Sequence, residues 1–388
     1  PVLGPLMKPL HTAGWHGGKT LRGRSRADEH RAVLAEIAQI AREHEVDFAL
    51  VAGDLFDTPA PTPESERVVY RALLDLRETG AQVIILSGNH DNPNRLEAVK
   101  PLLDIGGIHT SHQVCPADAG GVLNLEAKDG TPLRVSLMPF LSKRGIIRAT
   151  DLMALDADKH GQEYADRAER IIEALTLETN PNAVNLMTAH GMVHGGVLGG
   201  GERSAHVIFE YSIPGTAFPS KLHYVALGHL HRAQQIPGAC PIWYSGSPLQ
   251  LDFGETENPS SVNVIEAWPG KPAEIVQVPL KSGRRLRKIR GSLASLEALV
   301  DDVGDAYLFV ELTDPSRVGL ADEVRQLLPN TVDVRIQTRE SERPAPGEAR
   351  IGREPQELFA EYLESRNIQD PAVVALFKEL LDEAHAHD

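Results

Sequence analysis

The chain has 388 residues, of which 41% are hydrophobic and 24% are charged, and these proportions are typical of a globular protein with a buried core. The formal net charge of −15 excludes a protein that coats nucleic acid through an overall positive charge, although a local basic patch is compatible with phosphate contacts. No apolar run approaches the roughly 18 residues of a transmembrane helix, and Cys115 and Cys240 are too far apart to indicate a disulfide framework or a zinc motif, so we expect an intracellular protein.

Residues 1–6 precede Met7 and show no periodicity, so we expect them to be a remnant outside the fold. From Met7 to about residue 280, short apolar runs alternate with segments whose apolar residues have helical spacing. The apolar runs predict strands at residues 46–51, 82–86, 183–187 and 222–227. The helical spacing predicts helices at residues 28–43 and 64–78. This alternation favours an α/β architecture in which helices cover a sheet.

A residue that can bind a metal follows each of the four predicted strands within a few positions. These residues are Asp54, Asn89, His190 and His229. Open α/β sheets collect their functional groups at the carboxyl ends of the strands. We therefore predict that the four side chains share one site.

Two further histidines extend this set. His16 lies in the string GWH, and His231 lies in GHLH, where residues two apart on an extended segment share a face, so His229 and His231 point the same way. Carboxylate, amide and imidazole donors suit two divalent ions held about 3.5–4 Å apart, the arrangement that hydrolyses phosphoesters. The two oxygens of Asp54 could bridge the ions.

His90 and Asp91 complete the string GNHD. The near-neutral pKa of an imidazole makes His90 a suitable acid for a leaving alkoxide. The alternatives for His90 are a second metal ligand or a structural turn residue. Asp91 either orients the imidazole or caps the segment that follows.

Two basic clusters could contact DNA, and each could equally be a solvated loop. The first follows GWH and contains Lys19, Arg22, Arg24 and Arg26. The second contains Lys281, Arg284, Arg285, Arg287, Lys288 and Arg290.

The pattern changes near Pro272. We predict a compact α+β module with strands at residues 274–280, 307–312 and 331–336 and helices at residues 292–300 and 318–328. Residues 338–354 are rich in proline, glycine and charge and predict a linker. Two amphipathic helices at residues 355–366 and 371–385 are too small to form a core, so they either fold back on the body or dock on a partner.

Several strings in this chain resemble those of the calcineurin-like metallophosphoesterases, and more narrowly the SbcD family, the nuclease subunits of bacterial SbcCD complexes. The strings are LHTAGWHGGKTLRGRSR, GDLFDTPAPTPES, LSGNHDNPNRLE, GHLHRAQQI and YSGSPLQLDFGE. The resemblance implies an α/β fold, a β-sandwich flanked by helices. It also implies a nuclease domain at residues 7–280, a DNA-capping domain at 281–337 and SbcC-binding helices at 355–388.

The resemblance also implies roles for the site residues. The first metal would be held by His16, Asp54 and His231, and the second by Asp54, Asn89, His190 and His229. His90 matches the catalytic histidine of the family, with Asp91 beside it. The working ion would be manganese, with magnesium as the alternative.

The implied activity is double-strand exonuclease and single-strand or hairpin endonuclease action with the SbcC ATPase, in DNA repair, recombination and replication. The partners would be DNA ends, hairpins and single strands, together with a second copy of the chain, in the nucleoid region of the cytoplasm. Two other functions fit the same fold: a small-molecule phosphodiesterase or protein phosphatase, and a catalytically impaired scaffold that binds DNA ends.

Gly14 departs from the family pattern, which has an aspartate ligand of the first metal at this position. Glycine leaves that ion with three protein ligands. Either water fills the place with weaker affinity or the first site is empty, and we expect weakened activity in both cases.

Overall fold

The computed structural model describes residues 6–142, 145, 164–202, 212–336, 359, 363 and 373–377. It divides into two units, Pro1–Ile336 and Gln337–Asp388. The predicted linker at 338–354, residues 1–5 and most of the two predicted terminal helices lie outside the described residues.

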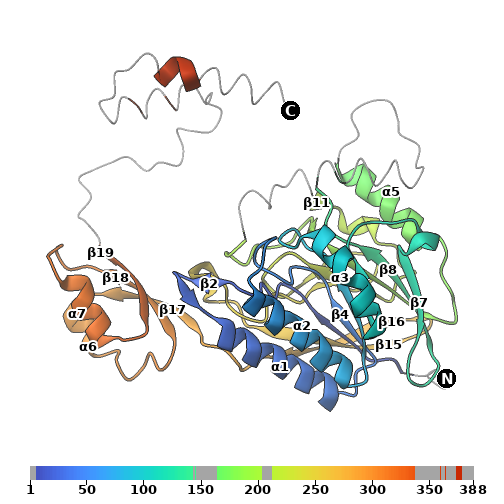
Figure 1. Ribbon diagram of the computed structural model, residues 1–388, viewed down its shortest axis with the longest axis horizontal. Coiled ribbons are helices and arrows are strands. Elements are labelled where there is room, and N and C mark those ends of the chain that lie inside the picture. The colour runs from blue at the N-terminus through green and yellow to red at the C-terminus, as the bar shows by residue number, and fades with distance from the viewer. Residues whose placement is uncertain are drawn as a thin grey trace. The chain divides into compact units, whose positions relative to one another are not determined.

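The first unit contains two six-stranded sheets, and the first sheet has the order β16-β15-β1-β4-β5-β6 (Figure 1). Its parallel strands are β1 (Pro9–Thr12), β4 (Phe48–Val51), β5 (Gln82–Leu86) and β6 (Ile108–Ser111). The antiparallel strands β15 (Ser261–Trp268) and β16 (Lys271–Pro279) complete one edge. A short hairpin of β2 (Thr20–Leu21) and β3 (Arg24–Ser25) follows β1.

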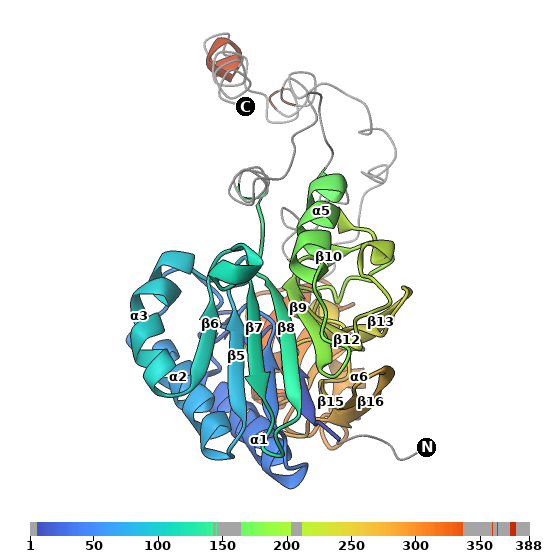
Figure 2. The ribbon, with the colours of Figure 1, turned by 90° about the vertical axis from the view of Figure 1, so that its right-hand side faces the viewer.

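The second sheet has the order β13-β14-β12-β9-β8-β7 (Figure 2). Its parallel strands are β8 (Pro132–Met138), β9 (Val184–His190), β12 (Tyr224–Gly228) and β14 (Ile242–Tyr244). The antiparallel strands β7 (Val122–Glu126) and β13 (Gln234–Ile236) form its edges. The short strands β10 (Met192–Val193) and β11 (Ser212–Ile213) pair separately.

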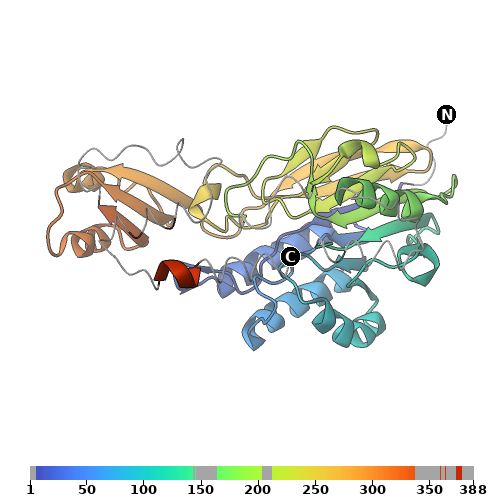
Figure 3. The ribbon, with the colours of Figure 1, turned by 90° about the horizontal axis from the view of Figure 1, so that it is seen from above.

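The two sheets pack face to face because their strands are apolar on both sides. In β4, Phe48 and Leu50 belong to the core between the sheets, whereas Ala49 and Val51 belong to the core under the helices. The helices α1 (Ala27–Glu43), α2 (Pro63–Glu78) and α3 (Pro93–Ile105) lie on one side of the sandwich, and α5 (Tyr164–Thr176) lies on the other (Figure 3). The expected α/β sandwich flanked by helices is therefore confirmed.

Caps explain where two of these helices begin. The Thr62 side chain accepts the backbone N–H of Ser65, and Pro63 occupies the first turn of α2. The Asn92 side chain caps α3 in the same way, directly after the string GNHD. The loops that carry Asp54 and Asn89 therefore lead from β4 and β5 into the capped helices α2 and α3.

A small domain with a parallel three-stranded sheet, β17-β18-β19, follows the sandwich (orange in Figure 1). Its elements are β17 (Leu286–Gly291), α6 (Leu293–Glu297), β18 (Tyr307–Leu312), α7 (Leu320–Leu327) and β19 (Thr331–Ile336). The prediction that residues 274–280 belong to this module is wrong, because β16 pairs with β15 in the first sheet. The true first strand, β17, has three basic residues among six, which obscured its two buried positions.

The described part of the second unit consists of a few residues from the predicted terminal helices. The rings of Phe359 and Phe377 stack with centroids 3.9 Å apart, so the two segments contact each other. Leu363 is buried, whereas Val374 and Leu376 remain about half exposed. None of the described helices combines the length and the apolar character needed to cross a membrane.

His11 in β1 predicts a pH dependence of stability. Its ring is fully buried, with Nδ1 at 2.9 Å from the Tyr224 hydroxyl and Nε2 at 3.1 Å from the Leu227 carbonyl, and burial lowers its pKa to about 3. Between pH 6.5 and 3 the unfolded chain binds a proton here that the native chain does not. The free energy of unfolding therefore falls as the pH falls, by up to about 1.4 kcal/mol per pH unit from this group.

Urea unfolding of metal-free protein at several pH values measures this slope. His11→Gln is expected to have a shallower slope than the original chain across that window. An identical slope in both proteins would show that His11 does not control acid stability.

Candidate metal centre

The candidate ligands lie at the carboxyl ends of strands from both sheets. The first sheet delivers His16 after β1, Asp54 after β4 and Asn89 after β5, and the second sheet delivers His190 at the end of β9 and His229 and His231 after β12. The carboxylate and the imidazoles are all 7% exposed or less. The loops are tight, since His16, Asp54 and His229 have positive φ angles of 44°, 54° and 114°. Buried polar groups in strained loops are typical of functional sites.

Four of these residues form one half of the cluster. Asn89 Oδ1 lies 2.9 Å from His190 Nε2 and 2.8 Å from His229 Nδ1, and His190 Nε2 lies 3.4 Å from Asp54 Oδ2. His190 Nδ1 donates to the Ala52 carbonyl at 2.7 Å, so the lone pair of Nε2 faces Asn89 and Asp54. Lone-pair atoms this close require a proton or a cation between them, and the donor types suit a divalent ion.

The other half contains His16, Asp54 and His231. His16 Nε2 lies 3.6 Å from Asp54 Oδ2, and His16 Nδ1 lies 3.5 Å from Asp57 Oδ1. Both His16 nitrogens are buried without a hydrogen bond to any described residue. The rings of His16 and His231 have centroids 4.9 Å apart. A buried imidazole that has no hydrogen-bond partner in the described part of the chain and lies beside a carboxylate fits a cation site.

Ligand-atom distances define two overlapping groups around Asp54. The candidate atoms of Asp54, His190 and His229 lie within 4.8 Å of one another, and so do those of Asp54, His16 and His90. His231 belongs to neither group, although its ring is close to that of His16. The group around His16 and Asp54 therefore contains His90 rather than the predicted ligand His231.

The protonation states of Asp54 and His16 favour cation binding. Burial opposes ionisation of Asp54, but the neighbouring His190 and His16 hold its pKa well below the usual value. Burial lowers the pKa of His16 to about 4, which keeps this imidazole neutral at pH 7. A charged carboxylate and a neutral imidazole are the forms that bind metals.

His90 is held in place by two contacts. Its backbone N–H donates to Asp54 Oδ1 at 3.0 Å, and its Nδ1 lies 2.9 Å from the Asp57 carbonyl. Donation from Nδ1 assigns any proton exchange with a substrate to Nε2. The ring centroid is 4.7 Å from that of His16, so both the acid role and the ligand role remain compatible with the geometry.

The Asp91 carboxylate contacts the backbone of two ligand loops and does not cap α3. Its carboxylate accepts the backbone N–H groups of Leu55, Phe56 and Gly88 at 3.1, 2.9 and 2.8 Å. Burial and the nearby Asp54 charge raise the pKa of Asp91 to about 6. Asp91 thus braces the two ligand loops against each other, while Asn92 caps α3.

Gly14 lies beside the His16–Asp54 half with a φ of 60°. A Cβ at this position would lie 2.7 Å from the Ser247 hydroxyl, which is buried and makes no hydrogen bond to a described residue. The hydroxyl can rotate away, and aspartate is among the residues that tolerate positive φ. The backbone therefore retains room for the carboxylate that the sequence lacks.

The first basic cluster has structural partners. Lys19 lies 3.1 Å from Asp57, Arg22 lies 3.3 Å from Asp333, and Arg24 donates to the Thr331 carbonyl at 3.4 Å. Arg26 is buried and binds Glu29 and the Gln250 carbonyl, so its guanidinium is not accessible to DNA in this conformation. The hairpin β2–β3 therefore joins the sandwich to the small domain.

Two residues that the sequence analysis did not single out contact the centre. Asp57, the second aspartate of GDLFD, faces His16 and Lys19, and their proximity keeps its pKa low despite burial. Glu255 lies 2.6 Å from His231 Nδ1. Their only sequence signal is their position in the strings GDLFD and YSGSPLQLDFGE.

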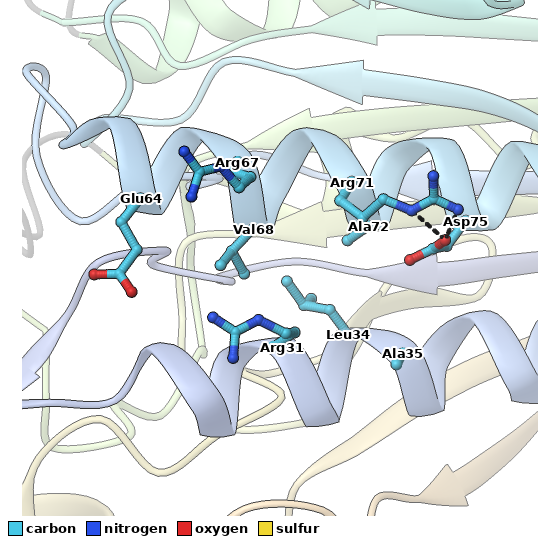
Figure 4. A pocket seen from close by; sticks show the side chains of 9 residues that line it. All are labelled: Arg31, Leu34, Ala35, Glu64, Arg67, Val68, Arg71, Ala72 and Asp75. Carbon is cyan, nitrogen blue, oxygen red and sulfur yellow. Dashed lines mark hydrogen bonds and ion pairs between the residues drawn. The ribbon is translucent and has the colours of Figure 1, made fainter.

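Two cavities differ in their relation to the centre. One of about 390 Å³ includes Asn89 in its lining, together with Asp91, His112 and Phe140. The other, of about 270 Å³, lies between α1 and α2 and is lined by Leu34, Val68 and three arginines among others (Figure 4). None of the predicted ligands lines the second cavity, so only the first is adjacent to the candidate centre.

Comparison with known proteins supplies two family matches. Residues 7–233 match the model of the calcineurin-like phosphoesterases. Residues 282–367 match the model described as the type 5 capsule protein repressor C-terminal domain. Together the matches cover most of the sandwich, up to residue 233, as well as the small domain and part of the second unit.

Curated relatives share similarity over most of their length. The SbcD subunit of the nuclease SbcCD from Bacillus subtilis (strain 168) is 33% identical over 313 residues, which cover 79% of this chain and 78% of that protein. The SbcD subunits from Escherichia coli (strain K12) and Rhodobacter capsulatus are 29% and 32% identical over 324 and 321 residues. These alignments cover 79% and 76% of this chain and 78% and 76% of the two proteins.

Proposed function

Because this chain belongs to the SbcD family of calcineurin-like phosphoesterases, we propose that it is a manganese-dependent DNA nuclease with exonuclease activity on duplex ends and endonuclease activity on single strands and hairpins. The convergence of buried ligands from both sheets around Asp54 supports this proposal most directly. A bound pair of divalent ions would supply a nucleophile at neutral pH and stabilise the charge that develops on the phosphate.

The residues of the chain divide this work. His16, Asp54 and His231 would hold the first ion, and Asp54, Asn89, His190 and His229 the second. The imidazole-rich set favours manganese over magnesium, which prefers oxygen ligands and retained water. His90 would give a proton from Nε2 to the leaving oxygen, and Asp91 would keep the two ligand loops in register.

DNA would be held by the exposed cations near the centre. We keep Lys19, Arg22 and Arg24 in this role. The side chains of Lys19 and Arg22 are 26% and 48% exposed, and Arg24 is an exposed residue of β3. Arg26 is removed from it, since its buried guanidinium is used by Glu29 and Gln250.

Gly14 motivates the second candidate function, a DNA-end-binding scaffold with weakened catalysis. With three protein ligands on the first ion and four on the second, the first is expected to bind less tightly. The two functions are separated by kcat on an end-labelled duplex and on a hairpin in manganese, compared with kcat on a small phosphodiester. Preference for DNA supports the nuclease, DNA binding without turnover supports the scaffold, and preference for the small ester would support the small-molecule alternative.

We further propose that the chain acts in the nucleoid region as a dimer with an SbcC-type ATPase, since its relatives carry the name of the SbcCD nuclease. The proposed SbcC-binding segment is residues 355–388, and the proposed DNA-capping domain is residues 281–337. The exposed Val374 and Leu376 support docking, because apolar side chains on a small helical unit gain stability from a partner surface.

Deletion of residues 355–388 is expected to abolish capture of SbcC while leaving manganese binding by the sandwich unchanged. Helix-in-groove docking concentrates its affinity in apolar side chains of this kind. Co-purification with tagged SbcC measures capture, and calorimetry measures metal binding. A truncated chain that still co-purifies at full stoichiometry would place the binding surface elsewhere.

A further inference from the structure

Glu255 is a buried carboxylate directly behind a proposed metal ligand. It ends the short 3-10 helix η5 (Phe253–Glu255), and its side chain is 2% exposed. Its Oε1 lies 2.6 Å from His231 Nδ1, and its Oε2 accepts the Leu251 backbone N–H at 2.7 Å. Among the described residues, His231 is its only ion-pair partner. Burial of a carboxylate costs free energy unless the charge is paired, so the contact with His231 offsets the cost of burying Glu255.

The contact determines which nitrogen of His231 faces the centre. Nδ1 is used by Glu255, which leaves Nε2 for the side where the His16 ring lies. The His231 backbone N–H also donates to Glu202 at 2.9 Å. Two carboxylates therefore fix the ring and the backbone of this residue. Metal-binding histidines commonly donate their second nitrogen to a carboxylate, which orients the ring and raises its basicity.

The surroundings leave the Glu255 carboxylate little freedom. A Cβ at Gly201 would lie 1.9 Å from Glu255 Oε1, so a side chain there would displace the carboxylate from His231. The absence of a side chain at this position is thus required by the Glu255–His231 contact.

The same segment contacts the small domain. Phe253, two residues before Glu255, is buried with Leu21, Leu286, Tyr307 and Phe309, and its ring lies 5.6 Å from that of Phe309. Gln250 accepts the Leu286 backbone N–H at 2.7 Å and donates to the Glu255 carbonyl at 3.1 Å. One side of the segment therefore touches β17 and β18, and the other touches a ligand.

We propose that Glu255 is a positioning residue for His231, and that residues 250–255 link the packing of the small domain to the first metal position. This inference rests on the proposed function, because it assigns the first ion to His231. It adds that the first ion binds tightly only while the small domain holds η5 in place.

Titration of the metal-free full chain with cobalt, followed by visible absorption and calorimetry, tests the proposal in the original and the Gly14→Asp backgrounds. Glu255→Ala is expected to lower the affinity for one of the two cobalt ions by about 10- to 100-fold and to change the cobalt absorption spectrum. Glu255→Gln is expected to retain most of the affinity, because its amide oxygen still accepts from Nδ1. Phe253→Ala should lower the affinity for the same ion, but to a smaller extent.

Glu36→Ala is the matched control. The Glu36 carboxylate accepts the backbone N–H groups of Lys281 and Ser282 near the small domain but touches no ligand. Unchanged affinity in Glu255→Ala, or an equal loss in Glu36→Ala, would overturn the positioning role. Unchanged affinity in Phe253→Ala would overturn the link to the small domain. If neither background binds an ion, the proposed function itself fails, and the inference fails with it.

Discussion

Replacement of His90 by alanine is expected to lower the rate of DNA cleavage by about 100- to 10,000-fold while manganese binding stays close to that of the original chain. The reason is the position of the ring. Nδ1 contacts the Asp57 carbonyl at 2.9 Å, so the proton that a leaving oxygen needs would come from Nε2. Loss of a general acid lowers kcat and leaves the affinity for the substrate largely unchanged.

Single-turnover cleavage of an end-labelled duplex and calorimetric titration with manganese measure the two quantities. His44→Ala is a suitable control, since His44 caps the far end of α1 and no candidate ligand contacts it. The ligand atom of His90 lies within 4.8 Å of those of His16 and Asp54, which gives the alternative role real weight. Loss of manganese binding in His90→Ala would therefore make His90 a ligand rather than the acid.

Replacement of Gly14 by aspartate is expected to tighten binding of the first ion by about tenfold or more and to raise the turnover on DNA. An additional carboxylate restores the fourth protein ligand, and the Ser247 hydroxyl, 2.7 Å from the new Cβ, can rotate and donate to it. The φ of 60° costs on the order of 1 kcal/mol for a residue with a side chain, so the metal-free variant should be less stable than the original chain.

Gly14→Asn separates the two effects, because asparagine has the same shape and tolerates the same backbone but has no charge. It is expected to lose stability like the aspartate variant without gaining the same affinity. Anomalous scattering from manganese-soaked crystals of the original chain gives the occupancies directly. Two equally occupied ions in the original chain would show that Gly14 does not weaken the first site.

The apolar runs of the chain predicted its layers well. Residues 82–86 form β5 as expected, and the runs at 46–51 and 222–227 contain β4 and most of β12, because strands buried on both faces leave a continuous apolar signal. Placement of candidate ligands after such runs was enough to predict that their side chains gather, as those of Asp54, His190 and His229 do. A strand that itself contains several charged residues gives no such signal, and β17 was missed for that reason.

Contacts between distant segments could not be predicted from the sequence. Arg26 looked like part of an exposed basic patch, but Glu29 and the Gln250 carbonyl, more than 200 residues away, bury its guanidinium. Asp91 was a candidate cap for the segment that follows it, yet its carboxylate binds three backbone N–H groups, two of which lie in the distant loop after β4. Glu255 has no local feature that sets it apart from other acidic residues. In each case the partner is determined by the fold, not by the local pattern.

The central claim is that the buried cluster around Asp54 makes this chain a metal-dependent nuclease. The most direct measurement is manganese-dependent cleavage of an end-labelled duplex by the original chain and by Gly14→Asp, each with and without Asp54→Asn. We expect cleavage that requires manganese, is faster in Gly14→Asp and is lost in both Asp54→Asn proteins. Cleavage that persists in Asp54→Asn, or an absence of cleavage in both the original chain and Gly14→Asp, would contradict the claim.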